Sequence, residues 1–169
     1  GISVKVSSFK RQVRNEVANA KINGNYVQST VALNEALAEG FDETLMLDTE
    51  GFVAEGSGEN FFMVKDGKLY SPDLDACLDG ITRKTIIRLA EELGIEFEEK
   101  KIQLEEVLEA DEAFFTGTAV ELVPINSIDK KSVADGLRGP ITKKIQKTFL
   151  DQVRGKRSEN QDWLTPVES

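Results

Sequence analysis

The stretch 77–94, CLDGITRKTIIRLAEELG, predicts an amphipathic helix that is entered through a glycine-containing loop. Its apolar side chains repeat at helical spacing and share one face: Ile86, Leu89, Ala90 and Leu93. Charged side chains such as Arg83 and Lys84 are expected away from that face. Thr82 is the expected N-cap, and Gly94 is the expected stop. The other elements of the chain are expected to be arranged around this helix.

The start of this helix is also a candidate anion site. Gly80 permits a sharp turn and the close approach of a ligand. The first-turn amides of Ile81 and Thr82, together with the helix dipole, favour a negative charge in front of them, and a phosphate suits that position. Ordinary capped helix starts are far more common than phosphate sites, so the plain helix start is the alternative unless residues elsewhere supply partners.

The rest of the pattern mixes strands and helices at short intervals, which predicts an α/β (α+β) domain with a mixed sheet. Strands are expected at 2–9, 44–48, 52–54, 60–64, 68–70, 95–102, 112–116 and 122–128. Helices are expected through Val31, Leu33 and Leu37 up to Gly40, around Leu104, Val107 and Leu108, and from Pro140 to about residue 153. Asp66 and Gly67 form a hairpin signal.

The pattern predicts one domain over residues 1–154 and a mostly polar tail over 155–169. Trp163 and Leu164 offer the tail apolar side chains for docking, but fraying is expected.

Composition narrows the classes of partner. The net charge of −9 and the pI near 4.7 argue against a broad nucleic-acid footprint and against attachment to an anionic membrane. No apolar run approaches membrane-spanning length and no signal peptide is visible, in a chain that begins at Gly1 rather than at Met. Cys77 is the single cysteine, so no internal disulfide forms and a cytoplasmic location is expected.

The chain contains no histidine, which removes Ser-His-Asp and Cys-His chemistry and most zinc sites within it. Any proton transfer must use Lys, Glu, Asp or Tyr. No Walker-type GxxxxGK[ST] is present, and the glycines of EGSGEN at 55–60 do not form a dinucleotide fingerprint. No metal site is expected.

Four short motifs, read together, resemble the fold-type IV pyridoxal-phosphate enzymes and, most closely, the branched-chain amino-acid aminotransferases. They are Lys21 in AKINGNY, Glu55 in EGSGEN, GITR at 80–83 and FFTGTA at 114–119, in the family's order and at its approximate spacings. The resemblance implies a mixed sheet or pseudo-barrel flanked by helices, the large domain of such an enzyme, with the small N-terminal domain absent from this chain. It also implies pyridoxal 5'-phosphate as cofactor and a homodimer or higher homo-oligomer.

By the same resemblance, Lys21 is the catalytic residue: it forms the Schiff base with the cofactor and then carries the proton of the transamination shift. Glu55 faces the ring nitrogen and keeps it protonated, so that the ring draws electrons as the α-proton leaves. Tyr26 lies beside the ring oxygen. Each residue also has a plain alternative without a cofactor. Lys21 would be a solvated surface lysine, Glu55 an ordinary acid on a turn, and Tyr26 a half-buried core tyrosine.

The remaining site residues also follow from the resemblance. The Ile81 and Thr82 amides form the phosphate cradle, with the hydroxyls of Thr82 and Thr118 as further donors. The backbone around Thr118 and Ala119 helps to receive the substrate carboxylate, and Leu78 packs on the cofactor ring. The alternative for Thr118 and Ala119 is a strand end with a tight turn, and the alternative for Leu78 is an ordinary core leucine.

The implied reaction is transamination between leucine, isoleucine or valine and 2-oxoglutarate, so the partners are small amino acids and 2-oxo acids. Relatives that act on D-amino acids or on aminodeoxychorismate share the lysine and the phosphate helix, and they are the alternative enzymes. A truncated, non-catalytic fragment is the alternative from another class. The phosphate-binding arginine and the side-chain pocket are expected in the absent domain and have no candidates in this chain.

Overall fold

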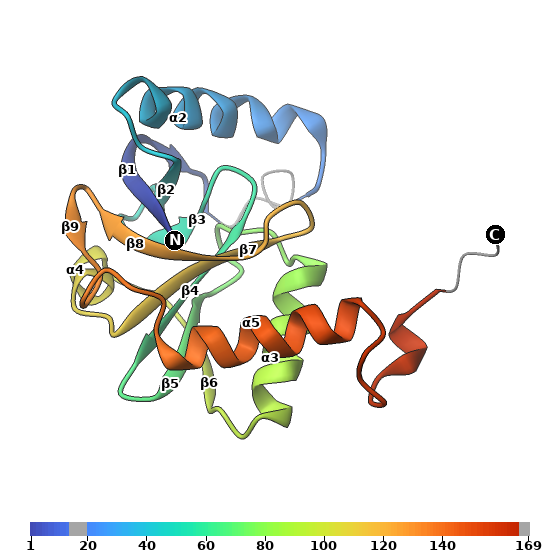
Figure 1. Ribbon diagram of the computed structural model, residues 1–169. Helices are drawn as coiled ribbons and strands as arrows, with labels where there is room; N and C mark the ends of the chain where they lie inside the picture. The colour runs from blue at the N-terminus through green and yellow to red at the C-terminus, as the bar shows by residue number, and fades with distance from the viewer. Residues whose placement is uncertain (14–19, 166–169) are drawn as a thin grey trace.

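The strands join into one mixed sheet that closes on itself (Figure 1). The computed structural model describes residues 1–13 and 20–165, so the expectations for 14–19 and 166–169 lie outside it. Within these residues the strands are β1 (Ile2–Arg11), β2 (Glu43–Asp48), β3 (Val53–Glu55), β4 (Asn60–Lys65), β5 (Lys68–Pro72), β6 (Phe97–Lys100), β7 (Glu112–Gly117), β8 (Glu121–Ile128) and β9 (Lys131–Ser132). The helices are α2 (Tyr26–Ala38), α3 (Ile81–Glu92), α4 (Leu104–Leu108) and α5 (Pro140–Val153), with single 3₁₀ turns η1 (Asn23–Asn25) and η2 (Gln161–Trp163).

The sheet runs in the order β3-β2-β1-β8-β7-β4-β5-β6, with β9 paired to β8. An additional pairing of β3 with β4, at Glu55 and Asn60, joins the first strand of this order to the sixth and closes the barrel. β1 runs parallel to both of its neighbours, and β5 runs parallel to β6, whereas the other pairs are antiparallel. The predicted α/β fold, a mixed sheet or pseudo-barrel flanked by helices, is confirmed.

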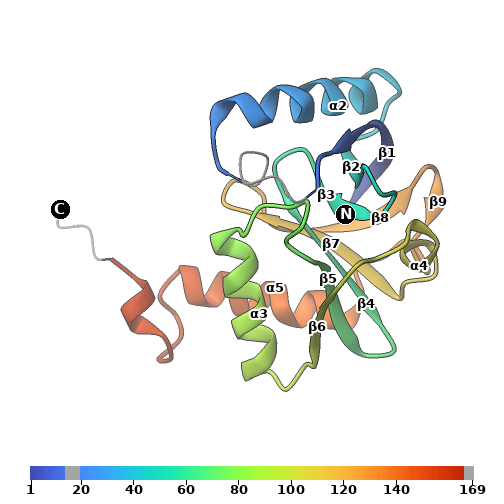
Figure 2. The same cartoon turned by 180° about the vertical axis from the view of Figure 1, so that it is seen from behind.

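β4 and β7 are buried on both faces, which explains their nearly continuous apolar sequences. Alternate residues of β4 enter different cores: Phe61 packs inside the barrel, and Phe62 packs against α3 and α5. Phe62 stacks on Phe114 of β7 with ring centroids 5.2 Å apart. α3 and α5 lie side by side on this face, while α2 covers β1 and β2 on the other side of the molecule (Figure 2).

The hairpin between β4 and β5 is confirmed, since Asp66 and Gly67 both have the positive φ values, 51° and 78°, of a two-residue type I′ turn. The strand expected at 95–102 is shorter in the structure, where it is β6 (Phe97–Lys100). Among residues 1–13 and 20–165, no helix combines the length and the apolar character needed to cross a bilayer.

The tail is held more firmly than its polar sequence predicted. Arg157 and Asn160 both donate to the Glu92 carboxylate at the end of α3, at 2.9 and 2.7 Å. Gln152 of α5 also donates to the Asn160 carbonyl at 3.1 Å. The described part of the tail is therefore tied to α3 and α5, in place of the expected fraying.

The start of α3 differs from the sequence-based expectation in two respects. Gly80, in extended conformation, is the N-cap, so the prediction of Thr82 was wrong. Arg83 is buried at 3% exposure rather than solvated, because it pairs with Glu99 and donates to the Pro72 carbonyl at 3.3 Å. These contacts fix the first turn of α3 against β5 and β6.

Gly80 is required because Asn60 lies against it. A Cβ added to Gly80 would lie 2.3 Å from Asn60 Oδ1, although the φ of −68° is one that alanine adopts readily. We expect Gly80→Ala to lower the free energy of unfolding in urea by about 1–3 kcal/mol, because the side chain or the loop must shift. Gly24→Ala, with nothing within 4 Å of its Cβ, is the control and should change it by less than about 0.5 kcal/mol. Equal losses in the two variants would contradict the steric account.

Candidate active site

Lys21 and Tyr26 are brought together by the short turn η1. Lys21 Nζ donates to Tyr26 Oη at 2.9 Å and lies 5.3 Å from the centre of its ring. Lys21 is exposed and Tyr26 is half-buried at the start of α2. The amine is thus oriented by a phenol while its surroundings stay open to a ligand.

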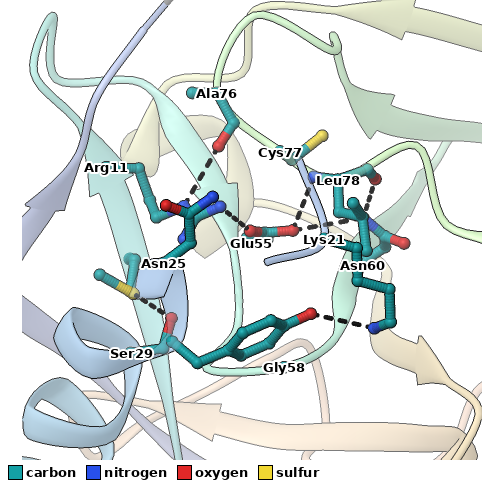
Figure 3. Close-up of polar contacts among 12 residues, drawn as sticks. Arg11, Lys21, Asn25, Ser29, Glu55, Gly58, Asn60, Ala76, Cys77 and Leu78 are labelled. Carbon is teal, nitrogen blue, oxygen red and sulfur yellow. Dashed lines mark hydrogen bonds and ion pairs between the residues drawn. The ribbon is translucent and has the colours of Figure 1, made fainter. Parts of the chain in front are cut away.

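Glu55 is a buried acid with both carboxylate oxygens engaged (Figure 3). Arg11 Nη2 lies 2.6 Å from Oε1, and the Leu78 N–H donates to Oε2 at 3.0 Å. Burial raises the pKa of Glu55, and the positive charge of Arg11 and the Leu78 N–H act in the opposite direction. The acid is held in one orientation at the end of β3.

Asn60 connects this acid to the turn that leads into α3. Its Nδ2 donates to the Leu78 carbonyl at 2.7 Å and lies 3.5 Å from Glu55 Oε2. The Leu78 carbonyl also accepts from the Gly80 N–H at 2.9 Å. The Lys84 N–H donates to the Gly80 carbonyl, which is the first hydrogen bond of the α3 helix. The amides of Ile81 and Thr82 lie in the first turn, before that bond, and so have no acceptor within the helix.

A cavity of about 200 Å³ lies in front of the α3 start. Its lining includes Lys21, Leu78, Ile81, Thr82, Thr116 and Thr118. A smaller adjoining pocket is lined by Arg11, Tyr26 and Glu55, and the two share Gly58, Asn60 and Leu78. The structure therefore gathers the predicted cofactor-binding residues around two adjoining cavities. Ala119 is exposed in the turn after β7.

Sequence reasoning missed Arg11 and Asn60. Arg11 ends β1, beyond the strand expected at 2–9, and its partner Glu55 is 44 residues away. Asn60 is expected from the sequence only as the first residue of a hairpin strand. The one local signal was a polar residue beginning a run that is otherwise apolar, in NFFMVK.

The arrangement offers an oriented amine, a fixed buried carboxylate and the first-turn amides of α3 around two adjoining cavities. That set suits a flat, anionic ligand that reacts with an amine, as pyridoxal phosphate does. Among the described residues, no group of three or more His, Cys, Asp or Glu is placed to hold a metal ion.

Glu59 is a second acid beside this site, and it is half-buried. Its Oε2 accepts from the Gly58 N–H at 2.9 Å. Burial, with the nearby Glu43 carboxylate, raises the pKa of Glu59 to about 7. The folded state therefore prefers the neutral acid and loses stability as the pH rises from about 4.5 to about 7.

We expect Glu59→Gln, which keeps an acceptor for Gly58, to gain stability relative to the unsubstituted protein as the pH rises from 4.5 to 8. The gain should be about 1–3 kcal/mol, because the variant has no carboxylate to ionise. Urea unfolding at a series of pH values measures it, with Glu91→Gln at an exposed position as control. A difference between variant and parent that is independent of pH would refute this assignment.

Comparison with known proteins agrees with this geometry. Residues 2–128 match the family model described as amino-transferase class IV. The branched-chain-amino-acid aminotransferase of Pseudomonas aeruginosa is 52% identical over 168 residues, which cover 99% of this chain and 55% of that protein. The probable branched-chain-amino-acid aminotransferase of Aquifex aeolicus is 45% identical over the same shares of the two chains.

Solved structures give the same result. The branched-chain amino acid aminotransferase from Thermobaculum terrenum, in its PLP form, superposes with a TM-score of 0.95 at 40% identity, over 100% of this chain and 56% of that one. The enzyme of the archaeon Thermoproteus uzoniensis with norvaline gives 0.92 at 46% identity, over 99% and 56%. The chain thus spans about half the length of its relatives. The family match over most of its residues shows that this chain belongs to the class IV aminotransferases.

Proposed function

We propose that this chain supplies the cofactor-binding part of a branched-chain amino-acid aminotransferase, with residues 1–154 as the binding domain and 155–169 as its tail. The reaction is amino transfer between leucine, isoleucine or valine and 2-oxoglutarate. One observation carries the proposal: Lys21, Glu55 and the start of α3 line two adjoining cavities. The names of the relatives support the choice of substrate.

The donor set fits pyridoxal 5'-phosphate in its chemistry. A lysine amine can bond to an aldehyde, a buried carboxylate favours a protonated ring nitrogen, and helix-start amides favour a phosphate. When bound, the cofactor supplies an electron sink for the removal of the substrate α-proton. In this proposal the phosphate is held by Ile81, Thr82 and Thr118.

Lys21 would hold the cofactor through its amine, and the same amine would move the proton at the substrate α-carbon. Tyr26 orients the lysine amine, since its hydroxyl accepts from Nζ. Arg11 and the Leu78 N–H hold Glu55 in one position, so its carboxylate would support a protonated ring nitrogen without reorganisation during the reaction.

The remaining contacts follow from the same proposal. Leu78 packs against the ring, and the backbone at Thr118 and Ala119 receives the substrate carboxylate. Self-association is proposed because the family completes its pockets across subunits, and a cytoplasmic location is proposed because the chain has a single cysteine. The phosphate arginine and the side-chain pocket are assigned to the part of the relatives' length that this chain does not span.

A non-catalytic fragment is the second candidate, favoured by the 55% coverage of the relatives. D-amino-acid aminotransferase and aminodeoxychorismate lyase share the lysine and the helix start, and the relatives' names favour the branched-chain activity over both. Assay of the full-length protein on a panel of L- and D-amino acids distinguishes the enzymes.

We expect Lys21→Ala to abolish the absorption band that the full-length protein forms with pyridoxal phosphate, and to lower transamination by at least about 10³-fold. The amine is both the anchor and the proton carrier. Spectra before and after borohydride, with turnover of leucine, measure both effects. Lys143→Ala, at an exposed position on α5, is the control and should behave as the unsubstituted protein. Appreciable turnover by Lys21→Ala without added amines would remove Lys21 from the mechanism. A colourless, unreactive full-length protein would favour the non-catalytic candidate.

A further inference from the structure

Thr116 carries a buried hydroxyl that has no partner. Its side chain is fully buried, with 0% exposure, at the end of β7. In the part of the chain that the structure describes, Oγ1 is one of a small set of buried polar atoms without a hydrogen bond. A buried hydroxyl in this state destabilises the fold unless something else bonds to it.

The sheet places this hydroxyl beside the α3 start. Thr116 of β7 lies directly opposite Asn60 of β4. This pair is on the same face of the sheet as the stacked pair Phe62 and Phe114, which lies two residues away along each strand. Phe62 and Phe114 belong to the core that includes the apolar residues of α3, so this face changes from apolar to polar where α3 begins. Thr116 and Asn60 both line the 200 Å³ cavity there.

Asn60 does not satisfy Thr116. Its amide group is directed to the Leu78 carbonyl and to Glu55, whereas Thr116 Oγ1, in a residue that lines the cavity, has no hydrogen-bond partner among the described residues. The same cavity is lined by Ile81 and Thr82, whose amides and helix dipole favour an anion. A hydroxyl donor is the group that such an anion would bind.

We propose that the Thr116 hydroxyl donates a hydrogen bond to the phosphate of the ligand held at the α3 start. This contact is additional to those of Ile81, Thr82 and Thr118, and it rests on the proposed function. Ligand binding would then give a partner to a donor that has none among the described residues. The Thr116 hydroxyl therefore lowers the stability of the protein without ligand and raises its affinity for the phosphate-bearing ligand.

Thr116→Val tests this double role, because valine keeps the shape and the strand propensity but lacks the hydroxyl. In the full-length protein without cofactor, we expect its Tm to rise by about 2–6 °C. We expect pyridoxal phosphate to bind about 5–30-fold more weakly, and pyridoxal, which lacks the phosphate, to bind within about 2-fold of the unsubstituted protein. Replacing a residue with only a structural role would change the affinities for pyridoxal phosphate and for pyridoxal by the same factor.

Two further variants serve as controls. Thr142 of α5 also has a buried, unpartnered hydroxyl, at 1% exposure, but it does not line the cavity. Thr142→Val should raise the Tm of the cofactor-free protein and leave the affinity for pyridoxal phosphate unchanged. Thr116→Ser, which keeps the hydroxyl, should bind pyridoxal phosphate within about 3-fold of the unsubstituted protein. If Thr116→Val does not fold, Thr116→Ala carries the same comparison.

Unchanged binding of pyridoxal phosphate by Thr116→Val, or an equal loss for pyridoxal phosphate and pyridoxal, would overturn the proposal. Failure of the proposed function is recognised separately, as an unsubstituted protein that forms no borohydride-sensitive band. In that case the increase in Tm caused by inorganic phosphate still tests Thr116. The proposal requires a smaller increase in Thr116→Val than in the unsubstituted protein, and equal increases overturn it.

Discussion

The buried ion pair of Arg11 and Glu55 is the interaction on which the candidate site depends. It joins the end of β1 to the end of β3, and Glu55 is also the residue that pairs with Asn60 where the barrel closes. Removing one member of a buried pair leaves an uncompensated charge and typically costs about 3–5 kcal/mol. The pairing that closes the barrel therefore also fixes the position of the Glu55 carboxylate.

The two ends of the candidate ligand site are connected through the main chain of Leu78. Its N–H donates to Glu55, and its carbonyl accepts from Asn60 and from the Gly80 N–H. The acid and the start of α3 consequently keep a fixed separation, which a rigid ring with a phosphate at one end requires. The buried Arg83 secures the same helix start from the other side, against β5 and β6.

The sequence predicted features that depend on local pattern. The turn at Asp66 and Gly67 and the apolar face of α3 follow from residue type and spacing alone. Features that depend on distant neighbours were missed: Arg11 binds an acid 44 residues away, and Gly80 lies against Asn60, so a side chain at position 80 would meet it. The N-cap at Gly80 rather than Thr82 was missed as well. The cofactor roles came from the resemblance of four motifs and stay predictions, although the residues themselves do gather around the cavities.

We propose that the fixed Glu55 carboxylate keeps the ring nitrogen of bound pyridoxal phosphate protonated. The nitrogen-15 chemical shift of ring-labelled pyridoxal phosphate, bound to the full-length protein at neutral pH, measures this directly. We expect a protonated ring nitrogen in the unsubstituted protein and an unprotonated one in Glu55→Gln, because the amide carries no charge to hold the proton. An unprotonated nitrogen in the unsubstituted protein, or the same shift in both, would contradict it.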